Sequence, residues 1–347
     1  MSGSRGSILI LALWVLSVLG IFSLSISYGV RQKISLIERL DRRYQLYRLA
    51  ELGVYRALAE LKKEDKTENF DSLSESWSTD DPLFRSVSPN EDGAFSIVFS
   101  PPTAGGGVKM RYGMQDEESK INLNTASPQI ISKLFEEVAH LDEEEANKIA
   151  YRIVDWRDPD NFYANPSYGA EDDDYEDLKP PYECKDHPFE VLNELLLVKG
   201  MTREVFEQVK GYVTIYGSGA VNIHTAPKEV LLALGLGEDA VKKILTFRAG
   251  TDGEEATPDD QAFTSTAAIT TSLTGALSFS GSELVEVSNL VSAGTLTTAS
   301  TVFMIRSRGE LAAKRQALDI AAVAGRDGKI FSWSAGNPYP WQLETGE

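Results

Sequence analysis

The feature that constrains this chain most is an uncharged run near its N-terminus. Residues 7–28 contain no charged side chain, and at about 1.5 Å per residue a helix of this length crosses a hydrocarbon core about 30 Å thick. The short segment before the run ends in Arg5 and Gly6. Three interpretations are open: a cleaved secretory signal, a plain membrane anchor, or the stem of a helical assembly. The run exceeds the ~7–15 apolar residues of a secretory signal, so that interpretation ranks third.

Helical periodicity continues beyond the apolar run. Apolar residues recur at three-and-four spacing from Ile34 to Leu61, with arginines between them and no proline, which is typical of an amphipathic helix. The sequence therefore predicts one transmembrane and amphipathic helix over residues 7–62, on the order of 80 Å long. We expect the chain's own head domain to cover the apolar stripe of its outer half.

The remainder predicts an α+β head with a small antiparallel sheet. Residues 62–92 are polar and contain prolines, so they are expected to form a connecting loop. Short runs of alternating polarity predict strands in two separate parts of the chain, and a turn around Gly309 is expected to join two of them. A further strand is expected at 283–291. The main predicted strands are 95–99, 108–112, 301–307, 314–320 and 329–333.

Between the two groups of strands the periodicity is helical, which predicts an all-α insertion. The insertion contains an internal echo, because Ile121-Asn122-Leu123-Asn124-Thr125-Ala126 is answered by Val221-Asn222-Ile223-His224-Thr225-Ala226, and each copy precedes a predicted helix. Helices are predicted at 128–138, 142–155, 190–198, 202–212, 227–234 and 238–247. The predicted organisation is a short segment at 1–6, which the resemblance given below identifies as a leader, then the helix at 7–62, sheet segments at 63–118 and 284–347, and the α-helical insertion at 119–283.

The insertion contains a strongly acidic segment. Residues 155–177 hold nine Asp and Glu side chains against one base, Arg157. Such crowding is repulsive unless the segment is solvated or binds a cation, and carboxylate oxygens favour Ca²⁺. Interleaved aromatic residues indicate a folded loop, so calcium is favoured slightly over a solvated acidic loop. Clustering selects four candidate ligands, namely Asp158, Asp160, Glu171 and Asp172.

Two other classes of function are DNA binding and enzymatic catalysis. Residues 197–202 and 234–239 resemble helix-hairpin-helix turns, which would fit a membrane-anchored DNA-binding protein. However, Glu238 and Asp239 occupy the helix start where a phosphate would bind, and the chain carries a formal net charge of −18, which repels nucleic acid. An enzyme is not predicted, because the chain has three histidines and no Gly-x-Ser-x-Gly or His-Glu-x-x-His motif.

Two sets of residues resemble a known family. The leader ending in Arg5-Gly6, followed at once by an apolar helix, resembles a type IV pilin-like precursor cut after Gly6 by a prepilin peptidase, with Ser7 as the methylated new N-terminus. The insertion motifs, taken in order, resemble the minor pseudopilin K family of type II secretion. These motifs are residues 116–126, 155–160, 169–172, 194–195 and 199–202.

This resemblance implies a pilin fold split by an α-helical insertion, with calcium in the insertion. Most pilin-like proteins carry Glu at the fifth mature position, which here is Leu11. Lacking that Glu, a subunit cannot pair with the amine of a subunit above it, so the resemblance implies a cap at the pseudopilus tip that helps to initiate assembly. Implied partners are the other minor pseudopilins, the major pseudopilin, the prepilin peptidase and the inner-membrane secretion platform, with no nucleic acid. The implied location is the inner membrane of a Gram-negative bacterium, single pass, with a periplasmic head.

Overall fold

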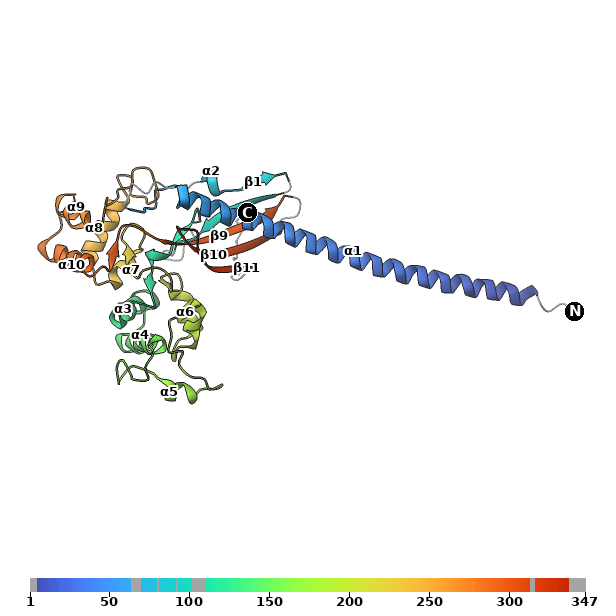
Figure 1. The fold of residues 1–347 in the computed structure, drawn as a ribbon, viewed down its shortest axis with the longest axis horizontal. Coiled ribbons are helices and arrows are strands. Elements are labelled where there is room, and N and C mark those ends of the chain that lie inside the picture. The colour runs from blue at the N-terminus through green and yellow to red at the C-terminus, as the bar shows by residue number, and fades with distance from the viewer. Residues whose placement is uncertain are drawn as a thin grey trace.

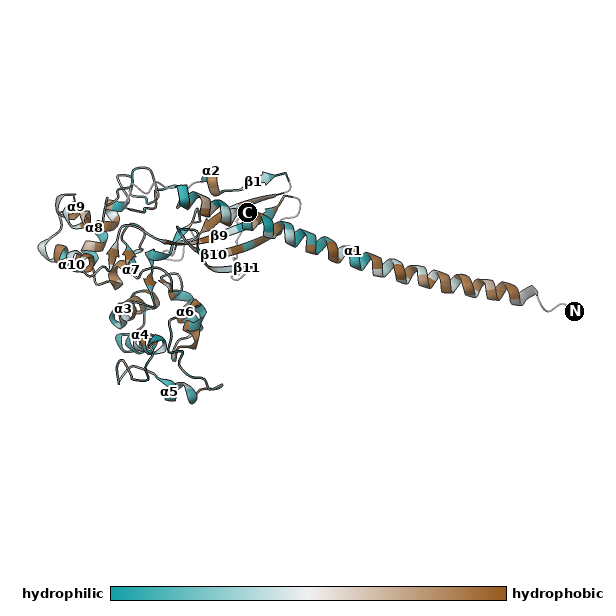
Figure 2. Ribbon diagram, viewed as in Figure 1, coloured by the Kyte–Doolittle hydropathy of each residue, from teal (hydrophilic) through white to brown (hydrophobic). Residues whose placement is uncertain are grey.

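A long N-terminal helix dominates the shape of the molecule (Figure 1). The structure is a computed structural model that describes residues 5–63, 70–79, 81–91, 93–101, 110–276, 278–312 and 316–336. Helix α1 spans Arg5–Lys63, which corresponds to roughly 90 Å. Its N-terminal half projects away from the head and is coloured as strongly hydrophobic in Figure 2. This half is long and apolar enough to cross a membrane, and none of its most apolar 18-residue window is buried. The predicted long helix is confirmed, whereas most of the predicted leader, residues 1–4, lies outside the described residues.

The second half of α1 packs against an antiparallel sheet, as the α+β prediction required. The sheet has the order β1-β2-β9-β10-β11, with β3 paired to β2 and β4 paired to β9. Its strands come from two separate parts of the chain, as predicted. The bounds are β1 Val87–Asn90, β2 Gly93–Phe99, β3 Arg111–Tyr112, β4 Gln115–Asp116, β9 Val302–Leu311, β10 Gln316–Gly325 and β11 Ile330–Ala335.

Two glycines allow α1 to approach the sheet closely. A Cβ atom at Gly309 would collide with the backbone of Leu46 and Ala50 on α1, and one at Gly53 would collide with the side chain of Ser307. The predicted turn around Gly309 is therefore wrong. This glycine lies inside β9, where it pairs with Leu318 of β10, and it serves helix packing instead of a chain reversal.

Two further predictions about local structure are wrong. The segment 62–92 contains a short helix, α2 (Asp81–Phe84), and the edge strand β1, so it is not only a loop. The segment 283–291 lies in helix α10 (Gly281–Ser292) instead of a strand. Ser280 caps this helix by accepting a hydrogen bond from the Glu283 amide. The boundary predicted between 283 and 284 therefore falls inside a helix, and the sheet resumes only at Val302.

The insertion is mainly helical and has its own hydrophobic core, separate from the core between α1 and the sheet. It is not entirely α-helical, because two short parallel strand pairs close it: β5 (Ile121–Asn122) with β6 (Val213–Thr214), and β7 (Val221–Asn222) with β8 (Leu296–Thr297). Its helices are α3 Pro128–Ala139, α4 Glu143–Arg157, α5 Asp172–Glu176, α6 Arg203–Val209, α7 Lys228–Ala233, α8 Glu238–Arg248, α9 Ala268–Ala276 and α10, with 3₁₀ turns at Leu192–Leu197 and, before β5, at Glu117–Ser119.

The sequence echo corresponds to a structural repeat. Each copy opens with a strand and a turn, continues into a helix pair, and ends in a strand that pairs in parallel with the first. We call residues 121–217 the first module and residues 221–300 the second module. They form two lobes, one containing α3 to α6 and the other α7 to α10 (Figure 1). The echo therefore marks two similarly built units.

Candidate metal site and the domain junction

Both modules use an arginine at the end of their second helix to hold the opening turn. In the first module, Arg157 donates hydrogen bonds to the carbonyl oxygens of Leu123 and, at 2.7 Å, Ala126. In the second, Arg248 donates to the carbonyl oxygens of Ile223 at 3.1 Å and Ala226 at 2.6 Å. Each arginine thus fixes the end of its helix against the turn that follows the first strand.

The acidic loop of the first module folds around Asp155, which is buried in helix α4. Its carboxylate accepts hydrogen bonds from the backbone amides of Ala164 and Ala170, each at 2.8 Å. Gly169 lies so close that a Cβ atom there would collide with the Asp155 carboxylate. The loop is therefore ordered by side-chain contacts to its own backbone, and a freely solvated acidic loop does not have this geometry.

Two acidic side chains of this loop have carboxylate oxygens without protein partners. The side chain of Glu171 is 2% exposed, and neither of its oxygens has a hydrogen-bond partner among the described residues, nor does Asp158 Oδ1. Burial and then the neighbouring carboxylates raise the pKa of Glu171 to about 8 and that of Asp158 to about 6. Buried polar atoms are nearly always satisfied, so these oxygens fit a site that a cation would complete.

The structure adds two residues to this site. Ligand atoms of Glu171, Cys184 and Asp186 all lie within 4.8 Å of one another. Burial raises the pKa of the Cys184 thiol, and the nearby carboxylates raise it further, while the thiol lies 3.7 Å from the Ala170 carbonyl oxygen as a hydrogen-bond donor. A thiol that stays protonated is a poor metal ligand. The remaining donors are carboxylate oxygens, and this set fits a hard cation such as Ca²⁺.

The four predicted ligands have different positions. Glu171 and Asp158 both have unsatisfied oxygens, and the charge of Asp158 helps to raise the pKa of Glu171, but only Glu171 belongs to the close group with Cys184 and Asp186. Asp160 is exposed and accepts a hydrogen bond from the Phe162 amide at 3.0 Å. Asp172 is engaged at both oxygens, by the Cys184 amide at 2.8 Å and by Asn161 Nδ2 at 3.1 Å. Sequence clustering did not select Asp186, because it lies beyond the acidic run and joins the site only through the fold.

The second module has no comparable group of unsatisfied carboxylates in the part of the chain that the structure describes. Its loop is closed by protein groups: Glu255 pairs with Arg248 at 2.6 Å, and Asp259 accepts hydrogen bonds from Thr251, Asp252 and Thr257.

The helix-hairpin-helix turns are both occupied by protein groups. Gly235 has a positive φ of 95°, as the predicted turn requires, but the Gly237 amide at the start of α8 donates to Glu286 at 3.1 Å. In the first turn, Lys199 Nζ pairs with Asp174 at 2.6 Å. In the second turn a carboxylate therefore occupies the helix start where a DNA phosphate would bind, and in the first turn the lysine is already paired, which argues against the DNA-binding alternative.

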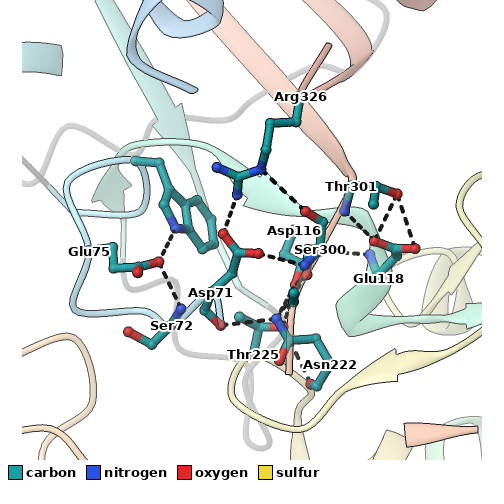
Figure 3. Close-up of polar contacts among 12 residues, drawn as sticks. Asp71, Ser72, Glu75, Asp116, Glu118, Asn222, Thr225, Ser300, Thr301 and Arg326 are labelled. Atoms are coloured by element: carbon teal, nitrogen blue, oxygen red, sulfur yellow. Dashed lines mark hydrogen bonds and ion pairs between the residues drawn. The ribbon is translucent and has the colours of Figure 1, made fainter. Parts of the chain in front are cut away.

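A buried polar cluster joins the sheet to the two modules (Figure 3). Asp116, which is 2% exposed, accepts hydrogen bonds from Thr225 Oγ1 at 2.5 Å and Ser300 Oγ at 2.6 Å. Asp71 accepts from the Ser300 amide at 2.6 Å and pairs with Arg326. We call these five residues and Glu118, which accepts from the Thr301 amide and Ser218, the junction.

The junction fixes the modules relative to the sheet, because its members come from widely separated segments. Burial raises the pKa of Asp116 to about 7, although the hydroxyls of Ser300 and Thr225 oppose that rise. No sequence motif pointed to this cluster.

Comparison with known proteins shows what the chain is similar to. The protein-family model described as "Type II secretion system (T2SS), protein K" matches residues 114–218, a range that begins just before the junction residue Asp116 and covers the first module. A relative named "Type II secretion system protein K", from Aeromonas hydrophila, is 27% identical over 271 residues, which are 70% of this chain and 75% of the relative. Both matches point to type II secretion protein K, and the chain is similar to this family over most of its length. It is a minor pseudopilin of type II secretion, as the sequence resemblance predicted.

Solved structures show the same fold. One chain of the GspK-GspI-GspJ complex from the type 2 secretion system of enterotoxigenic Escherichia coli matches with a TM-score of 0.64 and 17% identity, covering 86% of this chain and 99% of that one. The α+β architecture, with an α-helical insertion in a pilin-type sheet domain, is therefore confirmed for this pseudopilin.

Proposed function

We propose that this pseudopilin caps the tip of the pseudopilus and helps to initiate its assembly. The observation that carries the proposal is Leu11, an apolar and 65% exposed side chain on α1 at the position where most pilin-like subunits carry Glu. Without a carboxylate, α1 offers no partner for the N-terminal amine of a subunit above it. The two modules also make the head much wider than its single-helix stem (Figure 1). Further subunits can join beneath such a subunit but not above it.

The proposed partners of a subunit at the tip are the other pseudopilins. The E. coli structure is titled as a complex of GspK with GspI and GspJ, which supports the other minor pseudopilins as partners of this chain. The major pseudopilin would add beneath them, on the inner-membrane secretion platform. We place the apolar half of α1 in the inner membrane, and the head in the periplasm of a Gram-negative bacterium. In this proposal the chain is a structural subunit and not an enzyme.

We further propose that the first module binds calcium, with Glu171 and Asp158 as the central ligands and Asp186 beside them. Asp160 and Asp172 would order the loop around the ion. The support is the buried Glu171 carboxylate, neither of whose oxygens has a hydrogen-bond partner, and the unpartnered Oδ1 of the half-buried Asp158. These negative charges disfavour one another unless a cation is present. Calcium would supply positive charge only, and the residues supply the oxygens. Terbium luminescence sensitised by the buried Trp156, which lies two residues before Asp158, should appear and be displaced by calcium. Loss of this terbium luminescence in an Asp158→Asn variant would support the assignment. Luminescence equal to that of the wild type would refute it.

The tip proposal is tested by processing and by assembly. The intact mass of the protein from membranes should show loss of residues 1–6 and a methylated Ser7 only when the prepilin peptidase is present. A Leu11→Glu variant should still be processed and should still co-purify with the other minor pseudopilins, but it should lose its restriction to the tip. An uncleaved chain, or failure to co-purify with every minor pseudopilin, would contradict the proposal.

A further inference from the structure

The two edges of the sheet are built differently. Strand β1 at one edge has four residues, contains Pro89, and shifts register between Val87 and Asn90. Proline and irregular pairing are common ways of preventing an edge from pairing with another chain. Strand β11 at the other edge reads Ile-Phe-Ser-Trp-Ser-Ala, with no proline and no charge. Edge β11 therefore lacks the protection by proline that edge β1 has.

The register of β11 shows which backbone groups point away from the sheet. The Gly336 amide donates to the Asp319 carbonyl oxygen at 3.0 Å, and Ala335 lies opposite Ile320. Hydrogen-bonded and non-hydrogen-bonded pairs alternate in an antiparallel ladder. The N–H and C=O groups of Trp333 and Ala335 therefore point outward. In the described ranges no strand pairs with β11 on this side. A bulge beyond Ser332 ends the regular edge.

A groove of about 630 Å³ runs beside this edge, between the outer face of the sheet and the first module. Alternate residues of β11, Ser332 and Ser334, line it, and so do residues of β9, β10 and the first module, which include the apolar Val191 and charged side chains such as Glu207 and Arg306. Val191 is 55% exposed. In strand addition, backbone hydrogen bonds supply affinity, and pockets beside the edge accept alternate side chains. Strand β11 provides the free backbone groups and the groove provides the pocket, so both requirements of strand addition are present.

We propose that β11 accepts an extended segment of another pseudopilin as an added strand, with alternate side chains facing the groove. This inference rests on the proposed function, because it names how a partner of the tip subunit binds. The segment after β11 in this chain is a poorer occupant, because Pro338 and Pro340 each lack a backbone donor.

Hydrogen exchange on the full-length chain in detergent, alone and with the purified minor pseudopilins, tests this inference. Peptides covering residues 330–336 should exchange at least about tenfold more slowly in the complex, whereas peptides covering β1 should not change. An Ala335→Pro variant loses an outward N–H without losing a ladder bond, and should weaken the complex about fivefold to tenfold. The matched control, Ala335→Ser, keeps the N–H and should bind normally.

Three outcomes would overturn the inference, and they are distinguishable. A complex that forms with unchanged exchange at β11 would refute strand addition and leave the tip proposal standing. Absence of any complex would refute both. Faster exchange of β11 in a free chain shortened to residue 336 would show that the chain's own C-terminal segment occupies the edge.

Discussion

The two modules of the insertion share a frame but complete it differently. Arg157 and Arg248 hold equivalent turns through equivalent carbonyl groups. In the second module a protein carboxylate, Glu255, then pairs with the arginine at 2.6 Å. In the first module the loop after the arginine leaves both Glu171 oxygens and Asp158 Oδ1 without a hydrogen-bond partner among the described residues. The comparison teaches that one repeat is closed by an internal ion pair, whereas its neighbour leaves carboxylate oxygens unpartnered, and it is there that we propose an ion.

Single positions of the frame show the same divergence. Two residues before each arginine, the first module has Asp155, which organises the acidic loop, and the second has Thr246, which bonds only to its own helix at Lys242. Asn124 and His224 also correspond. Asn124 bonds the Ile215 carbonyl and the Phe189 amide, and His224 bonds the Thr298 carbonyl and the Phe263 amide. Asn124 and His224 therefore make equivalent contacts to the backbone, but only the histidine can take up a proton.

The largest expected effect comes from breaking the internal ion pair of the second module. Arg248 is 4% exposed, and Arg248→Met should lower the free energy of unfolding by about 3–5 kcal/mol, because it leaves Glu255 and two turn carbonyls without their partner. Urea unfolding of the purified protein measures this. Arg203→Ala, which removes an exposed pair at 3.8 Å, is the matched control and should change stability by less than about 0.5 kcal/mol. Equal effects of the two substitutions would show that the buried arginine does not hold the module.

The junction should make stability depend on pH. The pKa of Asp116 is raised from 3.8 to about 7, so between these values the folded state holds a proton that the unfolded state releases. Its contribution to the free energy of unfolding therefore falls as pH rises from about 4 to 7, by about 1.4 kcal/mol per pKa unit at most. Asp116→Asn removes this contribution, so the variant should gain stability relative to the wild type as pH rises. Parallel pH profiles of the wild type and the variant in urea unfolding would contradict the raised pKa of the buried Asp116.

His224 should give a smaller effect of opposite sign. Burial, and then the charge of Arg248, lower its pKa from 6.5 to about 4. Between pH 6.5 and 4 the imidazole of His224 therefore binds a proton in the unfolded state but not in the folded state. The free energy of unfolding falls as pH decreases over this range. His224→Asn installs the residue of the first module, which can make similar backbone bonds, and should remove this loss. An Asn variant that is still as sensitive to acid over this range would contradict the assigned pKa.

The sequence predicted those parts of the fold that depend on local periodicity. Helix α1, the paired module helices and the two groups of strands follow from spacing within each segment. The strand expected at 283–291 failed because Val285, Val287 and Val291 favour a strand by propensity, whereas the cap at Ser280 and the packing of Val287 favour a helix. The turn predicted at Gly309 is wrong because this glycine serves the close approach of α1, which is a contact between segments far apart in the sequence.

The candidate site was predictable only in part for the same reason. Glu171 and Asp158 lie in one dense acidic run, so composition alone located them. Asp186 enters the site through a separate loop. The junction joins Asp71 to Ser300 across 229 positions of the sequence, and no local pattern encodes that pairing. Local sequence patterns therefore predicted the helices and strands. Only the tertiary structure shows which carboxylate oxygens lack a partner.

Calcium-dependent thermal unfolding tests most directly the claim that one module requires an ion and the other does not. Wild-type protein, Glu171→Gln and Asp259→Asn would be melted in EGTA and in excess calcium. At about 100 times the dissociation constant, calcium should stabilise the wild type by about 2.7 kcal/mol. We predict that Glu171→Gln loses this shift, and that Asp259→Asn, which changes a carboxylate already bonded within its own loop, retains it. A calcium shift in Glu171→Gln equal to that of the wild type, or its loss in Asp259→Asn, would contradict the account.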